Sequence, residues 1–407
     1  LYNLGISLYA GGIRLAALWH GKARLWSEGR RNIFERMEAA VRPSDRIVWV
    51  HAASLGEFEQ ARPIIERLRA EHPEYKILLT FFSPSGYEIR KNYEGADYVF
   101  YLPADTPSNA RRFLDIVHPE IAIFIKYEFW INLLSELRRR KVRSYIVSAI
   151  FRRNSVFFRP YGAMWRQALE TFDTLFVQNV ESKRLLSEIG FDNVVVAGDT
   201  RFDRVAQIAA AAQRVETIER FRGGGRLFVA GSTWGPDEEI LLPLVNANPD
   251  VKFVIAPHEM DEGRIAHLMR DAKGGAVRYT QCDAATRFDD VQVLVLDTMG
   301  MLSSVYGSAT WAYVGGGFGV GIHNTLEAAT FGLPIAFGPN YGKFKEARDM
   351  VSLGCAVSVR TAGELAAWFA PLRDDEETLR RASRTAKDYT ARNQGATGII
   401  LRSIFNS

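Results

Sequence analysis

The sequence predicts an α/β protein built from two doubly wound, Rossmann-like domains. At 407 residues the chain is too long for one compact core, so two domains are expected. Short apolar runs typical of buried strands alternate with segments whose apolar residues recur at helical spacing, which is the order of a parallel sheet covered on both faces. The alternation lapses once, over residues 207–225, and then resumes. We therefore expect two such sheets, with a cleft between the domains that carry them.

The first domain, residues 31–206, starts its alternation at the apolar run Ile47–Val50. The segment 56–71 follows with Phe58, Ala61 and Leu68 at helical spacing, which predicts a helix. Further strands are expected at residues 77–82, 99–102, 121–125, 144–150, 174–177 and 194–197. Further helices are expected at residues 108–117, 130–140 and 181–189.

Residues 207–225 predict a linker, because an alanine run and three consecutive glycines offer little to pack on a sheet. The second domain, residues 226–407, then repeats the alternation. Its strands are expected at residues 227–231, 253–256, 293–296, 310–314, 335–337 and 356–359. One or two terminal helices are expected over residues 374–407.

The first 30 residues are apolar and aromatic up to Arg14 and basic after it. A membrane span needs about 20 apolar residues, and Arg14 interrupts this stretch too early. No small-residue cleavage site follows, so a secretory signal is not expected. A helix lying in an anionic membrane surface fits the composition. A helix packed on its own domain or on a partner fits equally well.

Charge and cysteine content narrow the class of protein. The net charge is +4, and basic residues gather near the start and again at residues 138–143 and 152–153. This suits an anionic membrane or a phosphorylated substrate, although solvated helix faces would give the same pattern. Cys282 and Cys355 are the only cysteines, which excludes a disulfide framework and fits a reducing compartment. The histidines show no metal-ligand spacing, so no metal is expected.

Three loops of the first domain carry candidate chemistry. Glu57, after the first strand, could be a general base, but Ser54 and Glu57 also have the spacing of a capping box. Lys126 and Glu128 follow another strand and could bind a phosphate or orient a hydroxyl, or could simply be solvated charges. Arg201 could meet a developing negative charge, or could pair with Asp203.

Four loops of the second domain predict a nucleotide site, because they follow strands whose carboxyl ends share one edge of a sheet. The longest, residues 315–339, combines three glycines with the start of a helix and so favours an anion. The candidate contacts from this loop and from the loop at residues 231–234 are Gly316, Gly317, His323, Asn324, Thr325, Leu326, Glu327, Ser232 and Thr233. The other two loops run over residues 257–259 and 297–301.

Together these motifs resemble a known family. The first half contains H-x-x-S-x-G-E, and the second contains P-x-x, D-T-M-G and G-G-x-F…H-N-x-L-E-x-A…G-x-P…G-P. This set of motifs is similar to that of the 3-deoxy-D-manno-octulosonic acid (Kdo) transferases of lipid A biosynthesis. The order and spacing match over essentially the whole chain. The resemblance implies a GT-B glycosyltransferase that moves Kdo from CMP-Kdo to a lipid A precursor by direct displacement. Inversion at the anomeric carbon and no metal in the transfer are implied as well.

The resemblance also implies roles for individual residues. Glu57 falls on the family's general base, and Arg201 on a lysine that stabilises the transition state. The CMP-binding positions fall on Pro257, His258, Met299, Gly300, Met301 and Asn324 to Glu327. The acceptor is then expected at His51, Ser54, Gly56 and Glu128. A peripheral or N-terminally anchored monomer at the cytoplasmic face of the inner membrane is implied, with no nucleic acid partner.

Four positions depart from the family pattern. Lys126 stands where the family commonly has glutamate, so it needs another role, such as binding an acceptor phosphate. Arg201 replaces lysine, which keeps the charge and changes its geometry. His258 replaces arginine, and Met301 replaces glutamate, beside the nucleotide. Two rival functions are a serine hydrolase that uses Ser54 on a nucleophile elbow, and a non-catalytic nucleotide-binding membrane protein.

Overall fold

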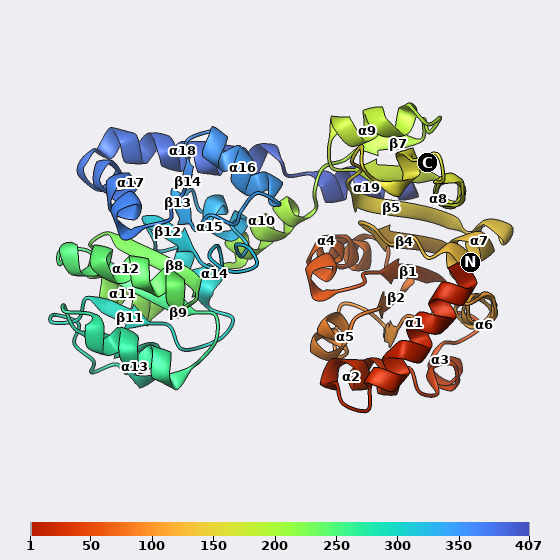
Figure 1. Ribbon diagram of the computed structural model, residues 1–407, viewed down its shortest axis with the longest axis horizontal. Helices are drawn as coiled ribbons and strands as arrows, with labels where there is room; N and C mark the ends of the chain where they lie inside the picture. The colour runs from red at the N-terminus through yellow and green to blue at the C-terminus, as the bar shows by residue number, and fades with distance from the viewer. Residues whose placement is uncertain (1, 407) are drawn as a thin grey trace. The chain divides into compact units, whose positions relative to one another are not determined.

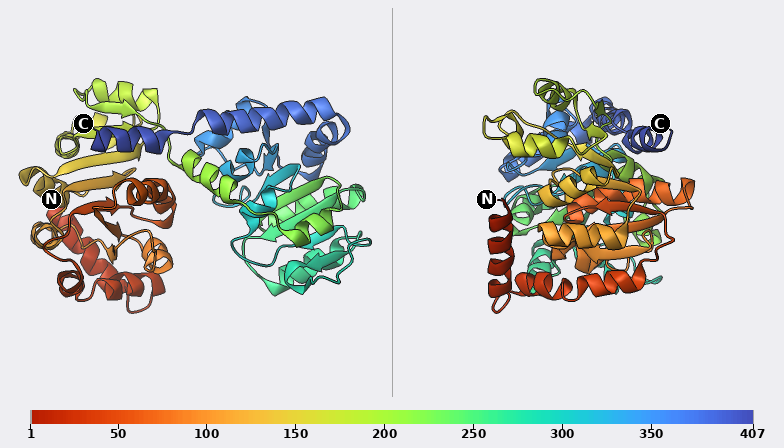
Figure 2. Two further views of the ribbon diagram at one scale, coloured as in Figure 1. Left: turned by 180° about the vertical axis from the view of Figure 1, so that it is seen from behind. Right: turned by 90° about the vertical axis from the view of Figure 1, so that its right-hand side faces the viewer.

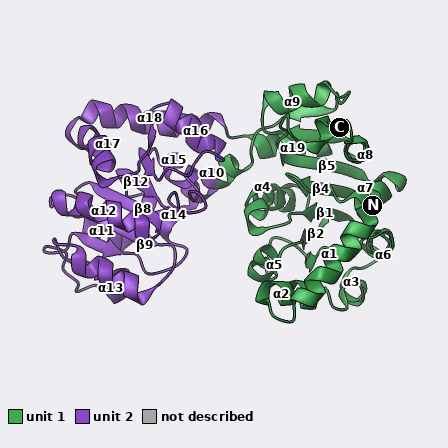
Figure 3. Ribbon diagram, in the orientation of Figure 1, with its two compact units in different colours: residues 1–204, 394–407 green, residues 205–393 purple. Residues whose placement is uncertain are grey.

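The computed structural model describes residues 2–406 and confirms the α/β architecture with two sheets. The chain forms two compact units, here called unit 1 (residues 1–204 and 394–407) and unit 2 (residues 205–393) (Figures 1 and 3). Each unit holds one seven-stranded sheet in which every pair of neighbouring strands is parallel. Helices cover both faces of each sheet.

The sheet of unit 1 has the strand order β3-β2-β1-β4-β5-β6-β7. Its strands are β1 (Ile47–His51), β2 (Lys76–Phe81), β3 (Tyr98–Tyr101), β4 (Ile121–Ile125), β5 (Arg143–Ala149), β6 (Thr174–Val177) and β7 (Val194–Val196). Its helices are α1 (Tyr2–Ala16), α2 (Gly21–Gly29), α3 (Ile33–Ala40), α4 (Leu55–Glu71), α5 (Pro84–Arg90), α6 (Pro107–Val117), α7 (Ile131–Arg139), η1 (Val156–Phe158), α8 (Ala163–Leu169), α9 (Val180–Ser187) and α19 (Ala396–Phe405).

The central strand β1 shows why this sheet is buried on both sides. All five of its residues are buried, and successive side chains point to opposite faces. Ile47 and Trp49 pack in one core with α3, α6, α7 and α8. Val48 and Val50 pack in the other core with α4 and α19. A strand with polar residues at every second position could bury only one face. Because β1 is buried on both faces, its residues from Ile47 to Val50 are all apolar.

The sheet of unit 2 has the strand order β10-β11-β9-β8-β12-β13-β14. Its strands are β8 (Leu227–Thr233), β9 (Lys252–Pro257), β10 (Ala276–Arg278), β11 (Val293–Val295), β12 (Trp311–Val314), β13 (Ile335–Phe337) and β14 (Ala356–Ser358). The other elements are α10 (Arg201–Ala211, which begins in unit 1), α11 (Glu216–Arg222), α12 (Gly235–Ala247), α13 (Glu262–Asp271), η2 (Tyr279–Gln281), α14 (Leu302–Tyr306), α15 (Leu326–Thr330), α16 (Lys345–Ser352), α17 (Ala362–Asp374) and α18 (Glu376–Arg392).

Two domain boundaries differ from those that the sequence predicts. Residues 207–225 are largely helical, because α10 and α11 occupy most of them, and Ile218 and Phe221 are buried in the core of unit 2. The terminal helix α19, expected in the second domain, belongs to unit 1. Its Ile400 and Ile404 pack in the same core as α4, and Figure 1 shows α19, in dark blue, beside β5 of the same unit.

Helix α1 lies on the outside of unit 1 (Figure 2). Several apolar side chains of α1 and of the turn after it are exposed and are here called its apolar stripe. Leu4, Leu8, Leu15 and Leu18 are exposed and recur at helical spacing. The start of the helix is held by Tyr2, whose hydroxyl donates to Asp105 at 2.7 Å. Among the helices of residues 2–406, none is both long and apolar enough to cross a membrane.

Candidate active site

The strand order puts one topological switch point in each sheet. In unit 1 the strand β1 has β2 as its neighbour on one side and β4 on the other, so the strand order reverses at β1. In unit 2 the strand β8 lies in the same way between β9 and β12. Ligands of open α/β sheets bind beyond the carboxyl ends of the strands at such a point. The loops after β1 and β4, and those after β8, β9 and β12, carry most of the residues that the sequence predicts as sites.

Glu57 lies in the first turn of α4, which begins directly after the switch-point loop of β1. Its Oε2 atom accepts hydrogen bonds from the backbone N of Ser54 at 2.9 Å and from the Ser54 hydroxyl at 3.1 Å. Burial raises the pKa of Glu57 above its ordinary value, and Glu128 raises it further, whereas Ser54, His51 and Lys126 act in the opposite direction. A carboxyl group with a raised pKa suits proton transfer near neutral pH.

Ser54 does not have the surroundings of a serine nucleophile. Its hydroxyl donates to Glu57, and the nearby His51 ring bonds instead to Thr80 and Glu128. A nucleophile elbow needs the serine to be activated by a histidine, which this arrangement does not provide. Gly56, the neighbouring residue, is exposed in the first turn of α4, where it is accessible to a ligand.

His51 is fully buried, so it does not meet the expectation that it binds an acceptor directly. Its Nδ1 atom lies 2.8 Å from the hydroxyl of Thr80, and its Nε2 atom lies 3.1 Å from Oε2 of Glu128. Glu128 is also buried, with 8% of its surface exposed, and accepts a hydrogen bond from Trp130 Nε1 at 2.7 Å. His51 and Glu128, two of the four predicted acceptor residues, therefore belong to an internal hydrogen-bonded group. Thr80 and Trp130 were missed because nothing in their local sequence marks them.

Lys126 follows β4 directly and has a left-handed backbone, with φ of 63°. Ser232, the second-last residue of β8 at the other switch point, has φ of 54°. A left-handed non-glycine residue costs on the order of 1 kcal/mol and is typical of functional loops. The two conformations lie at the carboxyl ends of different strands beside the switch points, after β4 in unit 1 and at the end of β8 in unit 2, next to loops predicted from the sequence.

Arg201 forms an ion pair with Asp199, a partner that the sequence analysis does not name. Its Nε and Nη2 atoms lie 2.9 and 2.8 Å from Oδ2 of Asp199. Asp199 also accepts from Gln60 Nε2 at 2.9 Å, and Gln60 lies one turn after Glu57 on α4. Asp203, the partner that the sequence suggests, accepts from Gly395 N and Thr397 N. The Asp199–Arg201 pair is therefore joined to the helix that carries Glu57.

In unit 2, Asp237 joins two of the predicted loops. It is buried, and its Oδ2 atom accepts from the backbone N of Trp234 and of Gly316, both at 2.9 Å. Its Oδ1 atom accepts from the Tyr313 hydroxyl at 2.7 Å. The Gly316 N–H is therefore used inside the fold and is not available to a phosphate. The sequence does signal this residue, since Gly235-Pro236-Asp237 is typical of a helix start.

Three aromatic side chains pack against one another where the loops after β8, β9 and β12 meet. The His258 ring is tilted against Trp234, at 4.8 Å between ring centres, and against His323, at 4.3 Å. Trp234 Nε1 donates to His323 Nε2 at 3.2 Å, which requires an unprotonated nitrogen there. Burial lowers the pKa of His323, and His258 lowers it further. The structure thus brings together His258 and His323, two residues predicted from separate loops.

The glycine loop needs its glycines for close backbone approach. A Cβ atom on Gly317 would lie 2.6 Å from the Cα of Gly338, a distance that real side chains do not show. Gly316 has φ of 90°, which favours glycine. The loop then leads to α15, which has five residues, so the dipole of this helix is short.

The remaining predicted donor residues divide into exposed and buried ones. Glu327 accepts from Ser303 Oγ at 2.6 Å and from Asn324 Nδ2 at 3.0 Å, which joins α15 to α14. Met299 is 78% exposed, beside Gly300 and Met301 at the start of α14. The side chains of Pro257, Thr233, Thr325 and Leu326 are buried. Only their backbone groups can reach a ligand.

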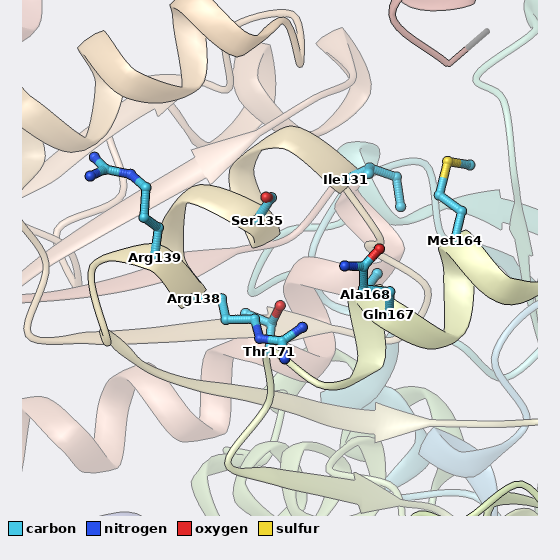
Figure 4. A pocket seen from close by; sticks show the side chains of 8 residues that line it. All are labelled: Ile131, Ser135, Arg138, Arg139, Met164, Gln167, Ala168 and Thr171. Carbon is cyan, nitrogen blue, oxygen red and sulfur yellow. The ribbon is translucent and has the colours of Figure 1, made fainter.

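A pocket of about 500 Å³ in unit 1 lies elsewhere, between α7 and α8 (Figure 4). Arg138 and Arg139 line it, but Arg138 pairs with Glu170 at 2.6 Å and Arg139 with Glu136 at 2.5 Å. The two arginines of this pocket are therefore already paired with carboxylates of the protein. The residues predicted from the sequence do not line it.

Comparisons with known proteins agree with the motifs. The family model described as 3-deoxy-D-manno-octulosonic-acid transferase (kdotransferase) matches residues 30–204. Proteins named 3-deoxy-D-manno-octulosonic acid transferase from Haemophilus influenzae and Bordetella pertussis are 25% and 28% identical, and each alignment covers 88% of this chain and 86% of the relative.

A solved structure of a UDP-N-acetylglucosamine 2-epimerase, assigned provisionally in Listeria monocytogenes, has a TM-score of 0.62 at 13% identity. The match covers 89% of this chain and 96% of that one. Such low identity supports the two-domain GT-B fold alone. The motifs, the family model and the relatives that span most of the chain support a Kdo transferase: this protein is an enzyme, a glycosyltransferase similar to the 3-deoxy-D-manno-octulosonic acid transferases.

Proposed function

We propose that this enzyme transfers Kdo from CMP-Kdo to a lipid A precursor, with inversion at the anomeric carbon and release of CMP. The observation that carries the proposal is the position of Glu57, at the switch point of unit 1, together with the raised pKa of its carboxyl group. The name shared by the relatives supports the sugar that is moved. The acceptor half of the reaction is assigned to unit 1 and the donor half to unit 2.

In the proposed step, Glu57 removes the proton from an acceptor hydroxyl as its oxygen attacks the anomeric carbon. The bond between that carbon and the phosphate oxygen of CMP breaks, and its electron pair leaves with CMP. Because both bonds from Ser54 go to Oε2 of Glu57, the proton is proposed to go to the other carboxylate oxygen, Oε1. A proton-accepting carboxylate held in this way contributes about 10²–10⁴-fold to the rate.

Cations are proposed to balance the charge that develops on the leaving phosphate. Arg201 keeps its orientation through Asp199, and Lys126 follows the strand next to β1. The exposed His258 and the loop at Gly317 are proposed to contact the nucleotide. A metal is not part of this proposal, so EDTA in the assay is expected to leave the transfer rate unchanged.

We further propose that the enzyme works as a peripheral protein at the cytoplasmic face of the inner membrane. The exposed apolar stripe of α1, with Trp19 after it, supports this, as do the exposed cations Arg14, Lys22 and Arg24 beside it. Apolar side chains would enter the headgroup region, and the cations would meet anionic lipid. Co-flotation with anionic vesicles, weakened by high salt, is expected.

The test of the transfer is incubation of the full chain with CMP-Kdo and a tetraacylated, bisphosphorylated lipid A precursor. Mass spectrometry of the lipid is expected to show a mass increase of one or more Kdo residues, with CMP released in equal number. The number of additions is read directly from the product. An unchanged acceptor in the presence of folded enzyme and intact CMP-Kdo would overturn the proposal.

A further inference from the structure

A second pocket of unit 1, of about 610 Å³, lies among α1, the start of α3 and the loop after β3. Pro103 and Ala104, which line it, follow β3, so the pocket lies at the same edge of the sheet as the loops after β1 and β4. Arg14, Arg30 and Arg31 also line it. Within residues 2–406 none of these arginines pairs with a carboxylate, unlike the arginines of the pocket between α7 and α8.

The carboxylates of this pocket do not balance its arginines. Glu28 and Glu35 line it, so three cations stand against two carboxylates. Glu35 also pairs with a further cation, Arg112, at 3.3 Å. The charge around the pocket is therefore positive, which favours an anionic ligand over a neutral one.

Arg30 has N–H groups that the protein does not use. Its Nε, Nη1 and Nη2 atoms donate to the carbonyl oxygens of Leu102, Trp26 and Phe82, at 2.8, 3.1 and 2.8 Å. Because each terminal nitrogen of a guanidinium carries two N–H groups, one remains on Nη1 and one on Nη2. N–H groups on the two terminal nitrogens of an arginine can bind two oxygens of one phosphate.

The start of α3 and two neighbouring side chains add donors that have no acceptor. Asn32, the residue before α3, makes no side-chain cap, and the backbone N–H groups of Ile33 and Phe34 have no acceptor within residues 2–406. The first N–H groups of a helix and its positive dipole end attract an anion. Ser27 Oγ and Trp26 Nε1 are buried without a hydrogen-bond partner, and Trp26 is only 5% exposed. All five residues line the pocket.

We propose that this pocket binds the phosphate group of an anionic lipid, whose acyl chains lie along the apolar stripe of α1. Phosphate oxygens would supply acceptors for the unused donors and a counter-charge for the arginines. A lipid is favoured over a soluble phosphate because Arg14 of the pocket and Leu15 of the stripe are neighbours in the last turn of α1. The proposal rests on the membrane association proposed above and not on the transfer reaction. Either a membrane phospholipid or the phosphorylated acceptor could supply the phosphate.

The first test titrates the full chain with inorganic phosphate at constant ionic strength, while NMR follows the indole N–H signals. The Trp26 signal, identified by its absence in Trp26→Phe, is expected to shift. In Arg14→Met/Arg31→Met, which removes two exposed cations, the midpoint is expected to rise about tenfold or more. Arg111→Met/Lys183→Met is the control, since both residues are exposed, do not line the pocket and form no ion pair within residues 2–406. Its midpoint is expected to stay unchanged.

The second test uses vesicles to distinguish the two lipids. Co-sedimentation is measured with phosphatidylcholine vesicles that contain either phosphatidylglycerol or the tetraacylated, bisphosphorylated lipid A precursor. Arg14→Met/Arg31→Met is expected to lose about tenfold in affinity for the vesicle whose lipid occupies the pocket, and a loss with either vesicle supports the proposal. Lys22→Met/Arg24→Met removes two exposed cations of α2 that do not line the pocket, and a smaller loss is expected. Equal losses in the two variants would show general attraction to an anionic surface and would overturn the pocket as the lipid site.

Two further results would contradict the proposal. A Trp26 signal that phosphate does not move, or one with the same midpoint in Arg14→Met/Arg31→Met, would show that the pocket is not a phosphate site. Phosphate binding without any vesicle binding by the unmodified chain would overturn a lipid as the source of the phosphate. Neither test uses the transfer reaction, so absence of transfer would contradict the proposed function and leave both tests of the pocket valid.

Discussion

Ser54 and Glu57 bond to each other in a way that suits two purposes, a helix cap and the proposed general base. The backbone N and the hydroxyl of Ser54 both reach Oε2 of Glu57, at 2.9 and 3.1 Å, and the pair closes a capping box at the start of α4. The cap and the general base, which the sequence presents as alternatives, are therefore compatible. The cap fixes the carboxylate, and a fixed carboxylate is a better proton acceptor.

Replacing Glu57 by glutamine is expected to separate these two purposes. Glutamine at this position of a capping box still accepts from Ser54, so thermal unfolding should be nearly unchanged. The transfer rate is expected to fall by about 10²–10⁴-fold, because the amide cannot take the proton. Glu59→Gln, two residues further on α4 in an ion pair with Arg90, is the control and should keep its rate. Near-normal turnover of Glu57→Gln would exclude Glu57 as the base.

The Asp199–Arg201 pair leads to a prediction about acid stability. Burial alone would raise the pKa of Asp199, but Arg201 and the hydrogen bonds outweigh it and the net pKa is lowered. A lowered pKa means stability that is present above the unfolded value, about 4, and is lost as pH falls through the folded value. Arg201→Met is therefore expected to cost about 2–3 kcal/mol at pH 7. Urea unfolding should show this difference disappearing in acid. A constant difference down to low pH would contradict the ion-pair explanation.

The glycine loop of unit 2 offers a steric test. In Gly317→Ala the new Cβ atom would lie 2.6 Å from the Cα of Gly338, so the backbone must shift, at a cost of about 1–3 kcal/mol. In Gly319→Ala the nearest atom would be 3.6 Å away, an ordinary contact. Calorimetric titration with CMP is expected to show binding lost in the first variant and kept in the second. Equal binding by both would remove this loop from the donor site.

Most strands could be predicted from the sequence, because a parallel strand that is buried on both faces consists of an unbroken run of apolar residues. Ile47–Val50 and Trp311–Val314 are clear examples. The loops at both switch points were predicted because they follow the carboxyl ends of these strands. Strand β10 was missed because it is a three-residue edge strand that contains Arg278. Helix α11 was missed because its buried residues, Ile218 and Phe221, are too few to stand out beside the glycines that follow.

The sequence predicted which loops carry the candidate site, but it predicted few of the contacts that their side chains make. A strand end marks a loop, but it does not say whether a polar side chain turns outward or inward. His51 and Glu128 turn inward and bond to Thr80 and Trp130, which are far from them in sequence or carry no motif. The place of α19 in unit 1 likewise depends on a contact with α4 across more than 300 residues of chain, which no local pattern encodes.

Arg30 is expected to hold the helical hairpin of α1 and α2 on unit 1. Its guanidinium donates to the carbonyl oxygens of Leu102 and Phe82, both at 2.8 Å, and of Trp26 at 3.1 Å. It also lies over the Trp26 ring at 3.9 Å. Arg30→Met would leave three carbonyl groups without this donor and is expected to cost about 2 kcal/mol or more.

Limited proteolysis of the full chain measures this directly, because a loosened hairpin is cut between α2 and α3 before the rest of unit 1. Arg30→Met should be cut faster than the unmodified chain. Arg31→Met is the matched control, since Arg31 is exposed and its side chain makes no hydrogen bond or ion pair with other residues of the range 2–406. Phe82 also packs on Trp130 at 4.6 Å between ring centres, and Trp130 donates to Glu128, so the same loosening should reach Glu128. Equal cutting of both variants would show that the hairpin is held by other contacts, such as Tyr2 with Asp105.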